Sequence, residues 1–172
     1  MRMGCAPIQI IFAKRILLKK LFLPITLSLL LFCSCTSIGT FEKNIVIPGH
    51  AWSSDFKPEI KLEITDTVSK HNMYVVLRHT NAYRYNNIWI NIYTQVPGNS
   101  NSNKQRFDLR LATDDKGWLG SGMDDIYEHR ILIAPVRFPR TGTYTFRFEN
   151  IMRDNPLEHV MNIGLRVERA TE

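Results

Sequence analysis

Hydrophobic and polar residues alternate along much of the chain after residue 57. The clearest case is the segment 57–65, in which isoleucine or leucine alternates with charged residues. The segments 87–95 and 142–150 repeat the pattern, with isoleucine in the first and tyrosine or phenylalanine in the second. A strict period of two is typical of a half-buried antiparallel strand, because successive side chains point to opposite faces of a sheet.

About eight strands are predicted, and turn residues separate them at short intervals. They span residues 42–47, 57–65, 71–79, 87–95, 106–112, 127–133, 142–150 and 160–168. The one helical candidate is a short turn within 151–157, which Pro156 interrupts. The pattern therefore predicts an all-β fold, an antiparallel β-sandwich of the jelly-roll type.

The first 35 residues follow a different pattern. Four basic residues between positions 14 and 20 precede an apolar run over 21–32, which stops at Cys33-Ser34-Cys35. A basic segment, a short apolar segment and a small residue before a cleavage point are the parts of a secretory signal peptide. The run of about 12 residues is shorter than the roughly 20 that a membrane-spanning helix needs, so it is predicted to be a cleaved export signal.

A cysteine at the cleavage point indicates a lipoprotein whose acylated first residue is that cysteine. Cys35 fits this role better than Cys33, because Cys35 follows the small Ser34 whereas Cys33 follows the bulky Phe32. An ordinary signal peptide without a lipid is the alternative. The predicted organisation is a signal peptide over 1–34, a lipidated tether over 35–41 and a β-sandwich over 42–172.

Removing the leader changes the charge of the chain. The whole chain has 22 basic and 16 acidic residues, a formal charge of +6. Residues 1–34 hold five of the basic residues and no acidic one, so 17 basic residues face 16 acidic ones in the mature chain. No basic arm remains to neutralise phosphates, and no nucleic-acid partner is expected. Cys35 is the only cysteine after residue 34, so stability must come from a core instead of internal disulfides.

The histidines are scattered and form no recognisable motif. Two of them, His71 and His79, flank one predicted strand and are expected at the surface; the others are His50, His129 and His159. The chain has no His-Glu-x-x-His pattern, serine-nucleophile elbow or phosphate-binding glycine loop. No catalytic residue, metal or cofactor is predicted.

Acidic residues surround a glycine-rich segment within 114–128. The acidic residues are Asp114, Asp115, Asp124, Asp125 and Glu128, and the segment between them is Gly117-Trp118-Leu119-Gly120-Ser121-Gly122. This loop is interpreted as a solvated hairpin with Trp118 packed onto the sandwich. Two alternatives remain open: a calcium loop, and an acid–base pair of the kind that glycosidases use. The last is the weakest, because nothing nearby would raise the pKa of one carboxyl group.

Aromatic and planar polar residues gather between positions 78 and 89. Such groups are suited to binding sugars or peptides, and arginine, tyrosine and tryptophan are common at interface hot spots. The alternative is that Trp89 is part of the core and the tyrosines cover a sheet edge. The candidate partner-binding surface consists of Arg78, Tyr83, Tyr85, Asn87, Trp89, Trp118 and Arg153.

A longer series of motifs carries a resemblance to a known family. In chain order they are Trp52 and Phe56; Ile64-Thr65-Asp66-Thr67; Leu77-Arg78-His79-Thr80-Asn81 with Tyr83, Tyr85, Asn87 and Trp89; Gly117-Trp118-Leu119-Gly120-x-Gly122; Arg130; Gly142-x-Tyr144-x-Phe146; Ile151-Met152-Arg153; and Val160-x-Asn162-Ile163-Gly164-Leu165-Arg166-Val167. Together these motifs extend over residues 41–168, and they resemble the gliding-motility lipoprotein family GldH of the Bacteroidetes.

The resemblance implies a non-enzymatic lipoprotein of the cell envelope, linked to gliding motility and the associated type IX secretion machinery. Its implied partners are the membrane, through the lipid, and other envelope proteins of that machinery. Residues 36–40 lack the acidic cluster associated with surface export in these bacteria, so an outer-membrane lipoprotein facing the periplasm is expected. The alternative is a carbohydrate- or peptide-binding β-sandwich module of the envelope, and a hydrolase is favoured only by the acidic loop.

Overall fold

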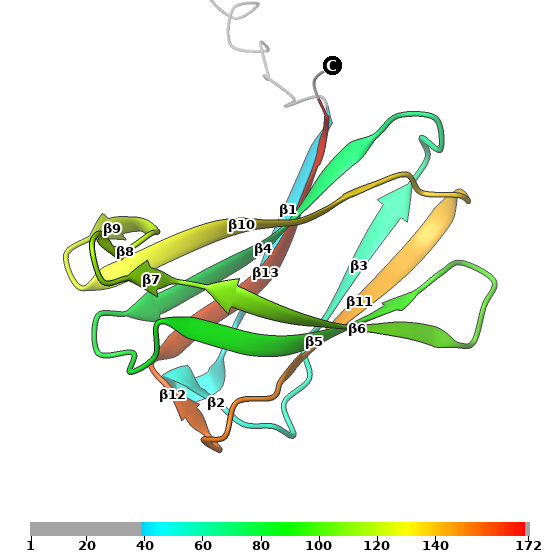
Figure 1. Ribbon diagram of the computed structural model, residues 1–172. Coiled ribbons are helices and arrows are strands. Elements are labelled where there is room, and N and C mark those ends of the chain that lie inside the picture. Colours follow the sequence, from blue (N-terminus) through cyan, green and yellow to red (C-terminus); the bar gives the residue numbers. More distant parts are fainter. Residues whose placement is uncertain (1–38, 171–172) are drawn as a thin grey trace, which may run out of the picture. The chain divides into compact units, whose positions relative to one another are not determined.

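A computed structural model describes residues 39–170 and shows a fold made almost entirely of β-strands (Figure 1). The predicted signal peptide and Cys35 lie outside these residues. One short 3₁₀ turn, η1 (Pro48–His50), accompanies the strands, and within the described range no helix is long and apolar enough to cross a membrane. The strands are β1 (Thr40–Val46), β2 (Ala51–Trp52), β3 (Glu59–Ile64), β4 (His71–Thr80), β5 (Asn87–Gln95), β6 (Ser102–Arg110), β7 (Ala112–Thr113), β8 (Gly117–Trp118), β9 (Ser121–Met123), β10 (Ile126–Val136), β11 (Gly142–Asn150), β12 (Leu157–Glu158) and β13 (Val160–Arg169).

Two antiparallel sheets make up the domain. The first has five strands in the order β1-β13-β4-β10-β9, and the second has four in the order β3-β11-β5-β6. Two-stranded ladders, β12-β2 and β7-β8, accompany them. Apolar residues from the inner faces of both sheets form one buried cluster, so the predicted antiparallel β-sandwich is confirmed.

The alternating segments form three neighbouring strands of the four-stranded sheet, β3, β11 and β5. In β3 the three apolar side chains are buried while the charged ones between them are exposed, as a half-buried strand requires. β5 and β11 have the predicted boundaries, and β11 places Tyr144, Phe146 and Phe148 in the core. Because the chain has no disulfide in this domain, these rings and the aliphatic residues opposite them supply most of its stability.

Two strands differ from their predicted boundaries by three or more residues at one end. β6 begins at Ser102, four residues before the predicted start of the strand at 106, because all of its residues pair with β5 regardless of their polarity. β10 continues past Pro135 to Val136 after a bulge between Leu132 and Ala134. β9 pairs β10 only as far as Glu128, so the proline lies where the described part of the chain has no strand on that side of β10, a position that tolerates a missing N–H.

Candidate functional site

The chain that leaves β4 folds back over the end of the sandwich and carries two of the candidate tyrosines. The Tyr83 amide donates to the Thr80 carbonyl at 3.0 Å, and the Asn81 amide donates to the Asp125 carbonyl at 2.6 Å. These bonds tie the loop both to its own strand and to the turn before β10. Tyr83 is thereby buried, and its hydroxyl donates to the Asn87 carbonyl at 3.0 Å. Burial raises the pKa of the Tyr83 hydroxyl, so it remains a neutral donor.

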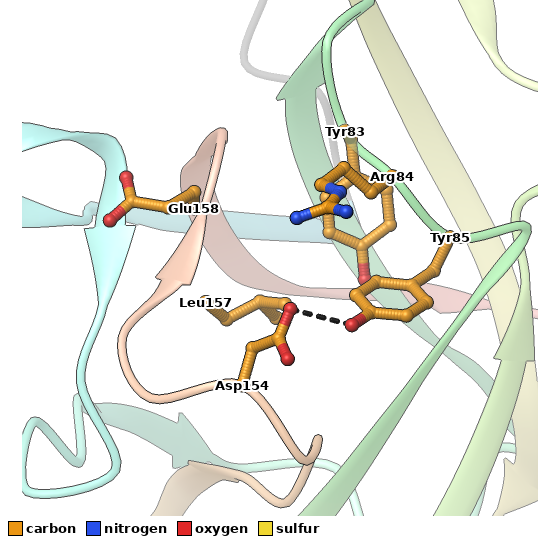
Figure 2. A pocket seen from close by; sticks show the side chains of 6 residues that line it. All are labelled: Tyr83, Arg84, Tyr85, Asp154, Leu157 and Glu158. Atoms are coloured by element: carbon orange, nitrogen blue, oxygen red, sulfur yellow. Dashed lines mark hydrogen bonds between the residues drawn. The ribbon is translucent and has the colours of Figure 1, made fainter.

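Tyr85 lies beside Tyr83 at the mouth of a small hollow (Figure 2). Its hydroxyl donates to Asp154 at 2.5 Å, and this bond is the main cause of the raised pKa of Tyr85. The hollow has a volume of about 40 Å³ and is lined by Tyr83, Arg84, Tyr85, Asp154, Leu157 and Glu158. Figure 2 shows the Glu158 carboxylate turned away from the Tyr85–Asp154 pair. Space of this size fits a water molecule or the tip of one side chain.

Two buried histidines lie beneath the tyrosines, contrary to the expectation that His79 is a surface residue. His79 on β4 and His129 on β10 are 0% and 3% exposed, and their Nε2 atoms are 2.9 Å apart. His79 Nδ1 lies 2.8 Å from the Thr80 carbonyl oxygen, which can only accept, so Nδ1 carries a proton. In the neutral pair His129 Nε2–H then donates to His79 Nε2.

Both imidazoles are held in the neutral form. Burial lowers the pKa of His79 despite its bond to the Thr80 carbonyl. Burial, and to a smaller extent the neighbouring His79, lowers the pKa of His129 to about 4. The pair satisfies its own hydrogen bonds without charge, as a buried polar group must.

Trp118 covers this pair from the glycine-rich loop. Its ring centroid lies 4.4 Å from that of His79, and its Nε1–H donates to Asn81 Oδ1 at 2.9 Å. A Cβ at Gly120 would lie 2.6 Å from the Glu128 carbonyl oxygen, so only glycine allows the loop this close to β10. We call Tyr83, Tyr85, Trp118, Tyr127, His79 and His129 the aromatic–histidine cluster, because ring contacts connect all six.

The acidic residues of the same loop do not assemble into a ligand set. Within residues 39–170, no group of three or more histidine, cysteine or acidic side chains is placed to hold a metal ion. The packing of Trp118 is that of the predicted hairpin loop.

The seven candidate residues lie on three different surfaces. Tyr83, Tyr85 and Trp118 come together in the cluster, and Arg153 is exposed in the loop between β11 and β12. Asn87 bonds Asp108 at 2.7 Å, and Trp89 lies on the outer face of the four-stranded sheet, with the Arg106 guanidinium 4.3 Å from its ring centroid. Arg78 lies on the outer face of the other sheet and forms a 2.5 Å ion pair with Glu128.

Arg78 is part of a network that the sequence did not reveal. Its three arginines and three glutamates are Arg78, Arg130, Arg166, Glu42, Glu128 and Glu168, and ion pairs link them in one series. Partial burial works to raise the pKa of Glu42, but bonds from Arg166 and Asn44 outweigh it, and the net pKa is lowered. Alternation along one strand does not show which charged residues meet across strands, so the sequence alone did not predict these pairs.

The fold and the cluster define the class of protein. It is an antiparallel β-sandwich in which, within the described residues, two histidines and four aromatic rings contact one another at one end. The profile of the GldH lipoprotein family matches residues 39–167, and the chain belongs to that family.

Two relatives agree with this assignment. The gliding motility lipoprotein GldH homolog of Christiangramia forsetii is 25% identical over 152 residues, which cover 83% of this chain and 91% of the relative. Gliding motility lipoprotein GldH of Flavobacterium johnsoniae is 25% identical over 151 residues, covering 83% and 92%. The predicted resemblance is therefore confirmed, and the protein is a lipoprotein of the gliding-motility type, associated with the cell envelope.

Among solved structures, a chain of the infectious bursal disease virus Gx strain is 12% identical, with a TM-score of 0.26. The match covers 76% of this chain, which spans only about a third (32%) of that chain. The likeness is too low to support an inference about fold or function.

Proposed function

We propose that this protein is a non-enzymatic lipoprotein of the outer membrane, facing the periplasm, that supports the gliding machinery and the type IX secretion associated with it. The observation that carries the proposal is the family match, which spans nearly the whole β-sandwich. The Flavobacterium johnsoniae relative, similar over 83% of the chain, is named for gliding motility. A role in motility is therefore proposed for the domain as a whole and not for one motif.

The state of the buried polar groups supports a non-enzymatic role. An acid–base catalyst needs a titratable group that reaches a substrate and exchanges protons near the working pH. His79 and His129 instead bond each other, are almost fully buried, and have lowered pKa values. Their arrangement suits a role in holding the end of the sandwich together.

Acylation of Cys35 would determine which end of the sandwich meets a partner. Residues 36–39 separate Cys35 from β1, and an extended chain spans at most about 3.6 Å per residue, so the start of β1 would lie within about 18 Å of the lipid. In the register of the first sheet, Thr40 pairs with Glu168 near one end, whereas His79 pairs with Val160 near the other. The aromatic–histidine cluster is then at the end of the sheet remote from Thr40, because His79 lies seven residues, about 23 Å, along β4 from Asn72, which pairs with Glu168.

The exposed groups beside this cluster are the proposed contact with the machinery. Tyr85 is half-buried and Arg153 is exposed, and both residue types are common at interface hot spots. The buried Tyr83 ring packs beside Tyr85, with the ring centroids 5.9 Å apart. Arg137 follows the other end of β10, where Val136 pairs with His71, and is equally exposed; it provides a matched control.

The test is affinity purification of the full-length lipidated protein from its native membranes, with mass spectrometry of the co-purified proteins. Gliding or type IX secretion components are expected with the wild type and with Arg137→Ala, and in reduced amount with Tyr85→Ala and Arg153→Ala. Recovery of glycan-handling proteins instead would favour a carbohydrate-binding module. A deletion strain with normal gliding and secretion would contradict the proposed role directly.

A further inference from the structure

The charged side chains on the outer faces of the two sheets are paired to different extents. On the five-stranded sheet, the three arginines and three glutamates of the network neutralise one another. On the four-stranded sheet, the acidic side chains are also engaged: Glu149 with Lys57, Glu63 with Thr143, Glu59 with Arg147, and Asp108 with Asn87. On the strands of this sheet, the cations without an ion pair to a described acidic residue are Lys61, Lys104, Arg106 and Arg110.

Three of these four cations lie on one strand. Alternation along β6 places Lys104, Arg106 and Arg110 on its outer face, and a two-residue repeat separates neighbouring outward positions by about 7 Å. Trp89 and Tyr93 on β5 hold two of them: the Arg106 guanidinium lies 4.3 Å from the Trp89 ring centroid and the Lys104 ammonium 5.5 Å from that of Tyr93. Cation–π contacts of this kind restrict the side chains while leaving N–H groups available to a ligand.

β6 is also an edge strand. It is the terminal strand of the order β3-β11-β5-β6 and pairs with β5 along all nine of its residues. In the part of the chain that the structure describes, no strand pairs with its other side. Its residues 102–106 are all exposed. An edge of this length presents a row of backbone donors and acceptors to another extended chain.

We infer that the edge of β6 binds an extended, acidic segment of a partner protein as an added strand. Backbone hydrogen bonds from the edge would align the segment, and acidic residues at alternate positions would lie beside Lys104, Arg106 and Arg110. Strand addition of this type takes its affinity from the backbone and its specificity from alternate side chains. Asp108 interrupts the basic series, so a neutral residue is expected opposite it.

Charge determines this choice of occupant. A second copy of the chain pairing antiparallel through β6 would bring Arg106 against Arg106, or Lys104 against Arg110, depending on the register. Like charges directly opposite one another destabilise a strand pair, and Asp108 would offset only part of this repulsion. An anionic membrane or polysaccharide would satisfy the cations but not the backbone groups of the edge. An acidic strand satisfies both.

The experiment uses full-length lipidated protein in detergent and fluorescent peptides as long as β6, with binding followed by anisotropy. One peptide alternates threonine with glutamate, the second is the same peptide with alternate backbone amides methylated, and the third carries lysine in place of glutamate. The glutamate peptide is expected to bind. The methylated peptide keeps the charge but lacks the backbone N–H groups that would donate to the carbonyl oxygens of β6, so it is expected to lose most of this binding. The assay measures binding alone, so its outcome is independent of any role in motility.

Protein variants locate the site. The double variant Lys104→Glu/Arg106→Glu turns two attractive exposed pairs into repulsive ones, so affinity for the glutamate peptide is expected to fall at least about tenfold, while the lysine peptide gains affinity. That gain can occur only if the variant is folded. Lys61→Glu makes the same charge change on β3, at the opposite edge of the same sheet, and is expected to leave binding unchanged.

Each contrary result overturns the inference. Equal binding of the methylated peptide would mean that charge alone is recognised. Equal loss in Lys61→Glu would place the site elsewhere on the face. Binding of phosphatidylglycerol vesicles or polygalacturonate without any binding of the peptide would identify the face as a membrane or glycan surface instead.

Discussion

Acid should destabilise this protein through one buried imidazole. Burial lowers the pKa of His129 from 6.5 to about 4. Between these pH values the imidazole is protonated in the unfolded chain and neutral in the folded chain. The stabilisation is present above the unfolded pKa of 6.5 and is lost as the pH falls below it. A difference of about 2.5 units at 1.36 kcal/mol per unit amounts to about 3 kcal/mol, of which about 2 kcal/mol should be lost between pH 6.5 and pH 5.

The assay is urea unfolding followed by circular dichroism at several pH values. The paired carboxyl groups of Glu42, Glu149 and Glu168 have lowered pKa values, so their stabilisation is present above the unfolded value of 4.5 and is lost only below it. Restricting the series to pH 5–6.5 therefore isolates the histidines. His129→Gln keeps an N–H that can donate to His79 and removes one titrating group, so the slope should fall by about 1.4 kcal/mol per pH unit.

A core substitution supplies the control. Ile60→Val removes one methylene from a fully buried side chain of β3, which costs about 1 kcal/mol at every pH and leaves the slope unchanged. If His129→Gln merely shifted the curve downward in the same way, the histidine would not titrate as its burial demands. The reasoning about the pair would then be refuted, even if the variant were less stable.

Two further substitutions test the outer face of the five-stranded sheet by urea unfolding at neutral pH. Gly164→Ala would place a Cβ 2.7 Å from the Lys43 carbonyl oxygen, and we expect a loss of about 1–3 kcal/mol from overpacking; wild-type stability would show that β1 can move away. Arg166→Ala breaks the bonds to Glu42 and Glu168, and because the pairs are partly exposed the expected loss is about 1 kcal/mol and smaller in high salt. A loss that does not depend on salt would mean that Arg166 acts through packing.

Local pattern predicted the strands but not the pairs between them. The alternation in 57–65 identifies β3 directly, because burying one face requires a period of two. The His79–His129 bond joins residues 50 apart, and it depends on the register between β4 and β10, which no short segment specifies. Two histidines at inward-facing strand positions were the available signal. For the same reason Tyr83 and Tyr85 were recognised as neighbours, whereas the place of Trp118 over them depended on a glycine contact with β10.

Three of the seven candidate residues, Tyr83, Tyr85 and Trp118, lie in the cluster. The fold explains why the others lie elsewhere. Asn87 and Trp89 are at odd positions of β5, whose even positions are the buried isoleucines. They must therefore point away from the core, on the same outer face as Asp108 and Arg110 of β6. Arg78 alternates with the buried Leu77 and His79 on β4 and points outward from the opposite sheet. Residues 78 and 89 are close in the sequence but lie in two different sheets.

The outer faces of the two sheets are suited to different roles, one to stability and the other to binding. Charges neutralise one another across β1, β13, β4 and β10. If Cys35 carries the proposed lipid, a pull on that lipid would be applied to β1, the first strand after it. A network centred on Arg166, which bonds both Glu42 on β1 and Glu168 on β13, resists such a pull. The β5–β6 face does not neutralise itself in this way, and its unpaired cations lie on an edge that a partner can reach. The ion pairs of one sheet and the proposed recognition at the other thus both depend on where the acidic residues lie.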